Sequence, residues 1–257
     1  MRLSSLHSEL AGPVVVPAVG NHTATLVFLH GTGEQAQFWA SFLAEYVQPH
    51  VKIVCPQAPL LSVTLYSAIL TAWFDIISKD PNAPEDEQGI ERSKTAIVKL
   101  IEEEISSGID PSRIVIGGFS QGGAQALYTG LTSNHSLAGI VAMSTWLPLR
   151  QKFPGAAVNP NISCWQAHGD MDFDAPYSYG KLTSDILKSF MPNHKFITYN
   201  NLTHTTNPEE MNDLEEYLSG LLPATTGGKV KIHIAHIAVR SFRVEFYVKK
   251  LSSFPSV

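Results

Sequence analysis

One pentapeptide in the sequence could supply a nucleophilic serine. Residues 118–122 are GFSQG, which fits the pattern G-x-S-x-G. The apolar run RIVIG precedes the pentapeptide and AQALYTGL, with helical spacing, follows it, so we expect Ser120 on a sharp strand-to-helix turn. Such a turn pushes the hydroxyl group outward, and Gly118 and Gly122 are needed because a Cβ atom there would collide with neighbouring backbone. Ser120 is therefore a candidate nucleophile, and an ordinary glycine-rich turn is the alternative.

A serine nucleophile needs a base, and catalytic residues on this kind of turn follow the chain order serine, acid, histidine. Six histidines follow Ser120: His135, His168, His194, His204, His233 and His236. His204 comes just after the apolar run KFITYNN, at the carboxyl end of a predicted strand. Ligands bind at that edge of an open α/β sheet. The sequence therefore predicts His204 as the base, and a surface-loop histidine is the alternative.

Three aspartates alternate in the segment HGDMDFDAP, residues 168–176: Asp170, Asp172 and Asp174. Alternating carboxylates also begin the EF-hand calcium loop, which has Gly at its sixth position and Glu at its twelfth. Ala175 and Lys181 occupy those positions here, so no metal site is predicted. The cluster follows a predicted strand and lies between Ser120 and His204, where an acid is expected. Position alone does not identify which aspartate has this role.

A second glycine-rich turn could stabilise negative charge. Residues 30–33 are HGTG and end the apolar run TLVFL. Backbone N–H groups of such a turn can bind a developing oxyanion together with the N–H of Gln121, which follows the candidate nucleophile. His30 precedes Ser120 in the chain, so we interpret it as a residue that hydrogen-bonds this loop.

Short apolar runs that alternate with helical patterns are expected to position these residues. Strands are predicted at residues 25–31, 52–59, 113–120, 137–144, 163–170 and 195–201, and helices at 89–108, 121–133, 177–191 and 208–222. The runs are rich in Val and Ile without polar alternation, which is typical of parallel strands covered on both faces. The pattern predicts an α/β fold with a mostly parallel, doubly wound sheet flanked by helices.

Composition restricts the class of protein. The chain has 257 residues, of which 44% are hydrophobic, enough for one large core. Its net charge of −5 argues against nucleic acid as a partner. Cys55 and Cys164 each lie in an apolar run, so we expect buried, reduced thiols. No run approaches the roughly 18 apolar residues of a membrane span, and no signal peptide is recognised, so the expected location is cytoplasmic.

Together these motifs resemble a known family, over residues 24–223. The sequence is similar to the acyl-protein thioesterases and lysophospholipase-like carboxylesterases of the α/β-hydrolase fold. The likeness rests on FLHGTG, KIVCPQAP, AWFDI, EDEQGI, RIVIGGFSQGGA, LAGIVAMSTWLPLR, HGDMD and THTT, in the family's order. It implies a serine hydrolase that cleaves long-chain acyl thioesters from protein cysteines and also esters of lysophospholipids, without a cofactor. The alternatives are a carboxylesterase with little action on proteins and an inactive hydrolase fold that binds acyl chains or partners.

The resemblance also assigns residues. It implies Ser120 as nucleophile, His204 as base and Asp172, the second aspartate of HGDxD, as the acid. It implies the backbone N–H groups of Thr32 and Gln121 as oxyanion donors. An acyl-binding surface is implied at Leu60, Leu61, Val63, Leu65, Trp73 and Phe74, for which core packing is the alternative reading.

Two residues depart from the family's pattern. Asp174 stands where the family tends to be apolar, so its carboxylate either points to water or alters acyl preference, because burying it would cost free energy. Glu34 replaces the usual aspartate after the HGxG turn. Asp170 is left with a structural role in shaping its turn.

The C-terminal segment lies outside the resemblance. Residues 229–257 contain six basic residues and one acidic residue, whereas residues 1–228 contain twelve and twenty-two. We therefore expect an α/β-hydrolase domain at residues 1–223 and a basic extension at residues 224–257. Apolar and charged residues alternate in KVKIHI and FRVEFYVK, which predicts two short strands or a hairpin. Peripheral contact with anionic membranes is one hypothesis for this extension, and a dispensable extension is the other.

Overall fold

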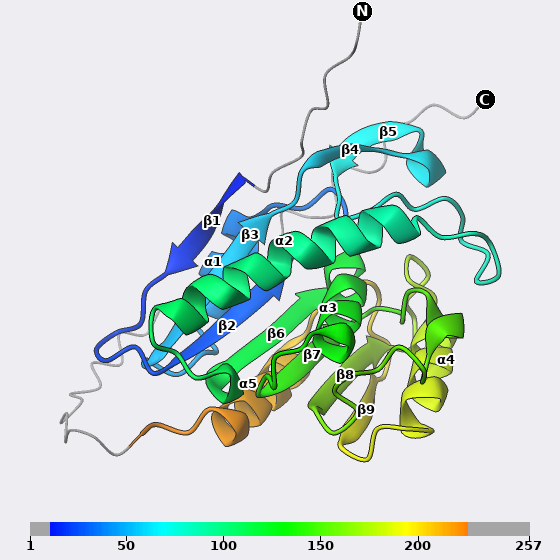
Figure 1. The fold of residues 1–257 in the computed structure, drawn as a ribbon. Coiled ribbons are helices and arrows are strands. Elements are labelled where there is room, and N and C mark those ends of the chain that lie inside the picture. Colours follow the sequence, from blue (N-terminus) through cyan, green and yellow to red (C-terminus); the bar gives the residue numbers. More distant parts are fainter. Residues whose placement is uncertain (1–10, 226–257) are drawn as a thin grey trace, which may run out of the picture. The chain divides into compact units, whose positions relative to one another are not determined.

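A computed structural model describes residues 11–225 of the chain (Figure 1). The chain divides into two units, Met1–Ala224 and Thr225–Val257, and all of the described residues except Thr225 belong to the first. The predicted strands of the C-terminal extension lie outside the described residues, so they and the domain border at residue 223 stay predictions.

Within residues 11–225, seven strands form the central sheet, in the order β1-β3-β2-β6-β7-β8-β9. They are β1 (Ala11–Val16), β2 (Ala24–Leu29), β3 (Val51–Gln57), β6 (Ile114–Phe119), β7 (Gly139–Met143), β8 (Ser163–Gly169) and β9 (His194–Tyr199). Strand β1 runs antiparallel to β3, and every other neighbouring pair is parallel. All six predicted strands are present, with small differences at their ends. The predicted fold class is confirmed.

In the described part of the chain, five α-helices cover the two faces of the sheet (Figure 1). They are α1 (Ala36–Leu43), α2 (Glu87–Ser106), α3 (Gln121–Thr132), α4 (Tyr177–Lys188) and α5 (Pro208–Leu221), with short 3-10 turns at Thr64–Tyr66, Pro111–Arg113 and Arg150–Lys152. Strand β2 shows the two layers: Val27 and Leu29 pack in a cluster with α2, α3 and α4, whereas Leu26 and Phe28 pack in a cluster with α1 and α5. Burial on both faces explains why these strands lack polar alternation.

The sequence patterns do not indicate β1, α1 or a small second sheet. Strand β1 is at the edge, contains Gly12 and Pro13, and has Val15 substantially exposed, so its apolar signal is weak. Helix α1 has only eight residues, too few for a clear helical period.

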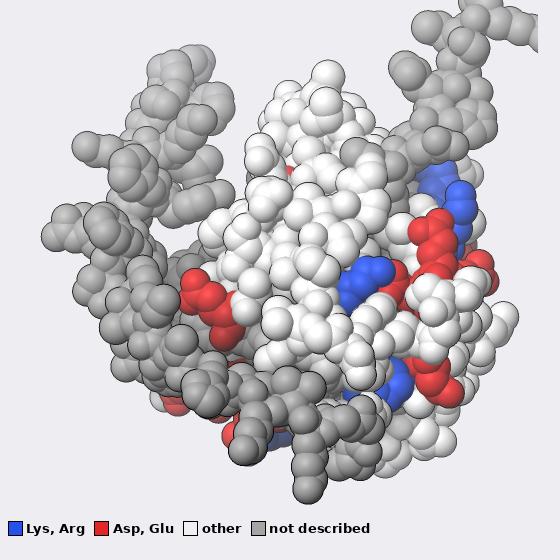
Figure 2. Space-filling view, turned by 90° about the vertical axis from the view of Figure 1, so that its left-hand side faces the viewer, with Lys and Arg blue, Asp and Glu red and all other residues white. Residues whose placement is uncertain are grey.

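The second sheet is an uncharged hairpin. Strands β4 (Leu60–Val63) and β5 (Ala68–Thr71) pair antiparallel around the turn Thr64–Tyr66. Leu60 and Ile69 are 69% and 71% exposed. Figure 1 shows this hairpin near the top of the molecule. At the same height in Figure 2, the described surface is largely uncharged. Lower on that face, basic groups lie beside acidic groups and form no continuous basic patch among the described residues.

Two glycines let helix α3 approach the sheet closely at the end of β6. A Cβ atom on Gly122 would collide with the carbonyl groups of Leu29 and His30 at the end of β2. A Cβ atom on Gly118 would collide with the backbone of Gly122 itself. The colliding atoms are backbone in both cases, so a side chain cannot be accommodated by a change of rotamer. This confirms the predicted need for glycine at both positions.

We predict that Gly122→Ala lowers the free energy of unfolding by more than about 3 kcal/mol, because α3 must move away from β2. Urea denaturation followed by circular dichroism measures this change. Gly220 of α5 has open space around its Cβ position, so Gly220→Ala is the matched control and should stabilise the protein by about 0.5 kcal/mol. Equal stabilities of the two variants would contradict the prediction.

Candidate active site

Ser120 occupies the turn between β6 and α3 in a strained backbone conformation. Its φ of 54° and ψ of −125° are rare for a residue with a side chain. Three bonds hold it there: its N–H donates to the Met143 carbonyl at 2.9 Å, and its carbonyl accepts from the Ala124 N–H and from the Thr145 hydroxyl at 2.7 Å. The serine is thus fixed in the geometry that G-x-S-x-G predicts.

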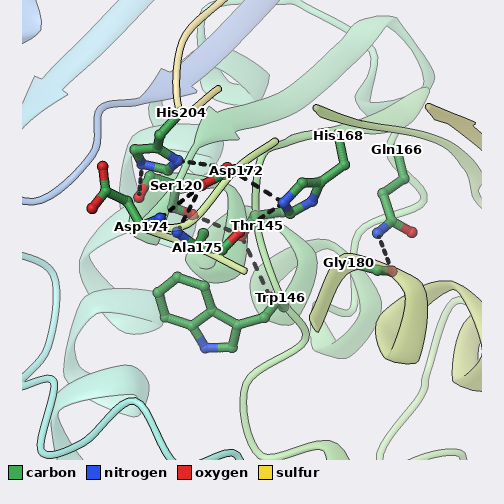
Figure 3. A network of polar contacts seen from close by, with 10 residues as sticks. All are labelled: Ser120, Thr145, Trp146, Gln166, His168, Asp172, Asp174, Ala175, Gly180 and His204. Carbon is green, nitrogen blue, oxygen red and sulfur yellow. Dashed lines mark hydrogen bonds and ion pairs between the residues drawn. The ribbon is translucent and has the colours of Figure 1, made fainter. Parts of the chain in front are cut away.

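Ser120, His204 and Asp172 form a hydrogen-bonded chain (Figure 3). Ser120 Oγ lies 3.0 Å from His204 Nε2, and His204 Nδ1 lies 2.7 Å from Asp172 Oδ2. The three residues follow β6, β9 and β8, so parallel strands bring them to one edge of the sheet. The structure therefore brings together Ser120 and His204, which the sequence pattern predicted, and Asp172, which the resemblance implied.

The surroundings of Asp172 keep it ionised. Its Oδ1 accepts hydrogen bonds from the N–H groups of Asp174 and Ala175, both at 3.0 Å. His168 is fully buried, donates Nε2–H to the Ala175 carbonyl at 2.8 Å and lies 3.4 Å from Asp172 Oδ2. Burial by itself would raise the pKa of Asp172, but the hydrogen bonds from His168 and His204 outweigh it and lower the pKa to about 2.

The other two aspartates of the cluster have different environments. Asp170 accepts a hydrogen bond from the Asn201 N–H at 2.6 Å and so ties the loop after β8 to the loop after β9. Asp174 is exposed, which matches the expectation that its carboxylate points to water. Burial raises the pKa of Tyr66, and the nearby Asp174 carboxylate raises it further, so Asp174 lies beside the hairpin.

The HGTG turn after β2 is held by two side chains. His30 Nδ1 donates to the Gly31 carbonyl at 2.7 Å, and Nε2 accepts from the Ala58 N–H at 3.1 Å. Burial lowers the pKa of His30, so the ring is neutral and serves the loop, as expected. Glu34 Oε2 accepts from the Gly31 N–H and from Trp39 Nε1, both at 2.7 Å. The residue that departs from the family's pattern is therefore part of the turn.

Two backbone N–H groups are left for a ligand. Within residues 11–225, neither the Thr32 N–H nor the Gln121 N–H has an acceptor in the protein. The two turns that carry these groups are in contact, because a Cβ atom on Gly31 would lie 3.2 Å from Ser120 Cβ. This arrangement can receive negative charge beside the serine.

The six residues of the implied acyl-binding surface divide into two groups. Val63, Trp73 and Phe74 are buried, and Trp73 and Phe74 belong to the core cluster beneath α2 and α3. Leu60 is exposed, and Leu61 and Leu65 are partly buried on the hairpin. Val63, Trp73 and Phe74 therefore pack in the core, whereas Leu60, Leu61 and Leu65 remain available as an acyl-binding surface.

Comparisons with known proteins identify the family of this chain. The family model described as Phospholipase/Carboxylesterase matches residues 10–222. The chain belongs to this family. It is 40% identical to acyl-protein thioesterase 1 of Neurospora crassa over 225 residues, which are 82% of this chain and 92% of that protein. It is also 40% identical to acyl-protein thioesterase 1 of Mycosarcoma maydis, over 84% of this chain and 99% of that protein.

Solved structures support the same assignment. Acyl-protein thioesterase 2 of Zea mays superposes with a TM-score of 0.75 at 32% identity, covering 82% of this chain and all of that one. A carboxylesterase of Bacillus cereus shares the fold, with a TM-score of 0.68 at 17% identity, over 84% of this chain and 96% of that one. This phospholipase/carboxylesterase family member is therefore a hydrolase of the α/β-hydrolase type.

Both cysteines are buried and free, and burial raises the pKa of each thiol to about 12. Among the described residues, no group of His, Cys, Asp and Glu side chains is arranged to hold a metal ion. No helix of the described part is long and apolar enough to cross a membrane.

Sequence reasoning missed one buried acid next to the site. Glu210, in the first turn of α5, is fully buried, and neither of its carboxyl oxygens has a hydrogen-bond partner among the described residues. Burial raises its pKa to about 8; the Asn207 backbone lowers it, and the Asp172 and Asp213 carboxylates raise it. The segment NPEE has Asn at the cap and Glu three residues later, a capping pattern that could have drawn attention to it.

We predict that Glu210→Gln removes a pH dependence of stability. The unfolded chain loses this proton near pH 4.5 and the folded chain near pH 8, so the free energy of unfolding falls as the pH rises between these values. Compared with wild type, the variant's free energy of unfolding should gain on the order of 4 kcal/mol between pH 4 and pH 8. Urea denaturation across this range measures the gain. Glu209→Gln, at the exposed neighbouring position, is the control. If the free energies of unfolding of Glu210→Gln and wild type differ by the same amount at every pH, the raised pKa of Glu210 is refuted.

Proposed function

We propose that this protein removes long acyl chains from protein cysteines by thioester hydrolysis and also hydrolyses lysophospholipids and carboxylic esters. The observation that carries the proposal is the chain of hydrogen bonds from Ser120 through His204 to Asp172. The relatives named acyl-protein thioesterase supply the substrate class. In this proposal the enzyme acts in the cytoplasm on substrates whose acyl chains hold them at membranes.

The first half of the reaction forms an acyl-enzyme. Ser120 Oγ attacks the thioester carbonyl carbon while His204 Nε2 takes the hydroxyl proton. Asp172 accepts the Nδ1–H bond, holds the imidazole tautomer and stabilises the imidazolium. The N–H groups of Thr32 and Gln121 bind the oxyanion. The carbon–sulfur bond then breaks, and His204 gives its proton to the departing cysteine thiolate.

The second half returns the enzyme to its starting state. His204 removes a proton from water, and the resulting hydroxide attacks the acyl-enzyme carbonyl. The oxyanion is bound by the same two N–H groups. The bond to Ser120 Oγ breaks, the serine recovers its proton from His204, and the fatty acid leaves. All groups used belong to this chain, and the proposal requires no cofactor.

The hairpin offers the acyl chain a place beside the serine. Leu60, Leu61 and Leu65 form part of its apolar surface, and Trp73 and Phe74 support its base from the core. The hairpin base is bonded to the HGTG turn, since the Thr71 carbonyl accepts from the Gly33 N–H at 2.8 Å. An acyl chain on this surface would therefore end near Ser120.

We predict that Ser120→Ala abolishes both hydrolysis of a p-nitrophenyl ester and labelling by a fluorophosphonate. Asp172→Asn should lower kcat by up to about 10⁴-fold, because the histidine loses its orienting carboxylate. Asp170→Asn is the matched variant in the same loop, and its loss should be smaller. Labelling of Ser120→Ala, or equal losses for the two aspartates, would contradict the assigned roles.

A carboxylesterase that acts little on proteins is the second candidate. The exposed carboxylate of Asp174 beside the hairpin favours it, because a long acyl chain avoids a charged neighbour. We expect kcat/KM for a palmitoylated peptide thioester to exceed that for lysophosphatidylcholine and for a short ester, as measured by thiol and fatty-acid release. The reverse order would support the second candidate, and Asp174→Asn would then be expected to shift preference toward the long-chain thioester.

A further inference from the structure

The two proposed oxyanion donors come from segments far apart in the chain. Thr32 lies in the turn after β2, and Gln121 is the first residue of α3. Their N–H groups must point at one oxygen atom, so the separation of the two segments has to be set accurately. A third segment, residues 71–74, is bonded to both, and we call it the 71–74 brace.

The brace holds the turn that carries Thr32 through three hydrogen bonds. The Thr71 carbonyl accepts from the Gly33 N–H at 2.8 Å, directly beside Thr32. The Thr71 hydroxyl donates to the Glu34 carbonyl, also at 2.8 Å. Trp73 Nε1 donates to the His30 carbonyl at 2.8 Å. Both ends of the turn are therefore attached to the brace.

The brace holds the other donor through the side chain of Gln121. Its Oε1 accepts from the Trp73 N–H at 2.9 Å, and its Nε2 donates to the Phe74 carbonyl at 2.6 Å. Gln121 is fully buried, so its carboxamide is held by this segment rather than by water. The backbone N–H of the same residue is the proposed oxyanion donor.

The brace is itself fixed in the core. Trp73 and Phe74 are almost completely buried. The Trp73 carbonyl accepts from the Ser93 hydroxyl of α2, and the Ala72 N–H donates to the Pro59 carbonyl at 3.0 Å. Because this segment is anchored to α2 and to the start of the hairpin, it can hold both turns at a fixed separation.

We propose that Thr71 and Gln121 are positioning residues: their side chains fix the two halves of the oxyanion hole at the separation that the tetrahedral intermediate requires. This inference rests on the proposed function. The oxyanion exists only after Ser120 has attacked, so loss of the brace affects the transition state and not the binding of substrate. Because the brace continues directly from β5, it also connects the apolar hairpin to the catalytic groups.

Thr71→Val tests the proposal, since valine keeps the shape and the backbone carbonyl but removes the hydroxyl donor. We expect kcat for a short p-nitrophenyl ester to fall about 10-fold with KM changed less than about 2-fold. Gln121→Met removes both side-chain bonds and should lower kcat about 100-fold. Thr71→Ser restores the donor and should recover most of the lost kcat.

Inhibitors separate positioning from general damage. A trifluoromethyl ketone forms a tetrahedral oxyanion with Ser120, so its Ki should rise in Thr71→Val by about the factor that kcat falls. The Ki of an ether analogue, which forms no oxyanion, should stay unchanged. Thr132→Val is the matched control, because the Thr132 hydroxyl donates to the Tyr128 carbonyl at 2.7 Å at the far end of α3.

The outcomes distinguish this inference from the proposed function. If Thr71→Val and Gln121→Met both keep the wild-type kcat, the positioning role of the brace is overturned, while the proposed hydrolase function stands. Equal weakening of both inhibitors in Thr71→Val also overturns it, since that result indicates a disordered site. A wild-type protein that neither cleaves esters and thioesters nor reacts with the fluorophosphonate overturns the proposed function, and the brace with it.

Discussion

The close approach of helix α3 to the end of strand β2 is the constraint on which the site depends. Gly122 allows it, because its α-carbon faces the carbonyl groups of Leu29 and His30 with no room for a side chain. This contact places Ser120 beside the HGTG turn. The Gln121 N–H is free of helical bonds because Gln121 is the first residue of α3. The strained backbone of Ser120 can persist because the surrounding strand, helix and turn leave no other conformation.

The surroundings of the two buried carboxyl groups near the site determine whether each is ionised. Asp172 and Glu210 are both buried, yet the pKa of the first is lowered to about 2 and that of the second is raised to about 8. Asp172 accepts hydrogen bonds from two backbone N–H groups and from His204, and His168 lies 3.4 Å from its Oδ2; these groups replace its lost hydration. Glu210 gains no comparable partners, so it remains neutral and adds no negative charge next to the His204–Asp172 pair.

One segment, the second strand of the hairpin with residues 71–74, connects the proposed acyl-binding surface to the proposed catalytic groups. The hairpin presents uncharged, exposed residues, and its second strand passes directly into buried residues that bond to both glycine-rich turns. The base of the hairpin is therefore anchored to buried residues, whereas its turn residue Tyr66 is exposed to solvent. Asp174 lies near that turn residue, outside the core, where its charge can stay hydrated.

The sequence by itself determined the parallel strands, the Ser120 turn and the place of His204, because these depend on local apolar runs, glycine positions and chain order. It could not choose among the three aspartates from position, since all follow the same strand. Only the tertiary structure decided the bonds of Asp172, the burial of Glu210, and the division of the acyl-binding stretch into core and surface. These depend on contacts between segments distant in sequence, such as Gln121 with residues 73 and 74, which no local pattern records.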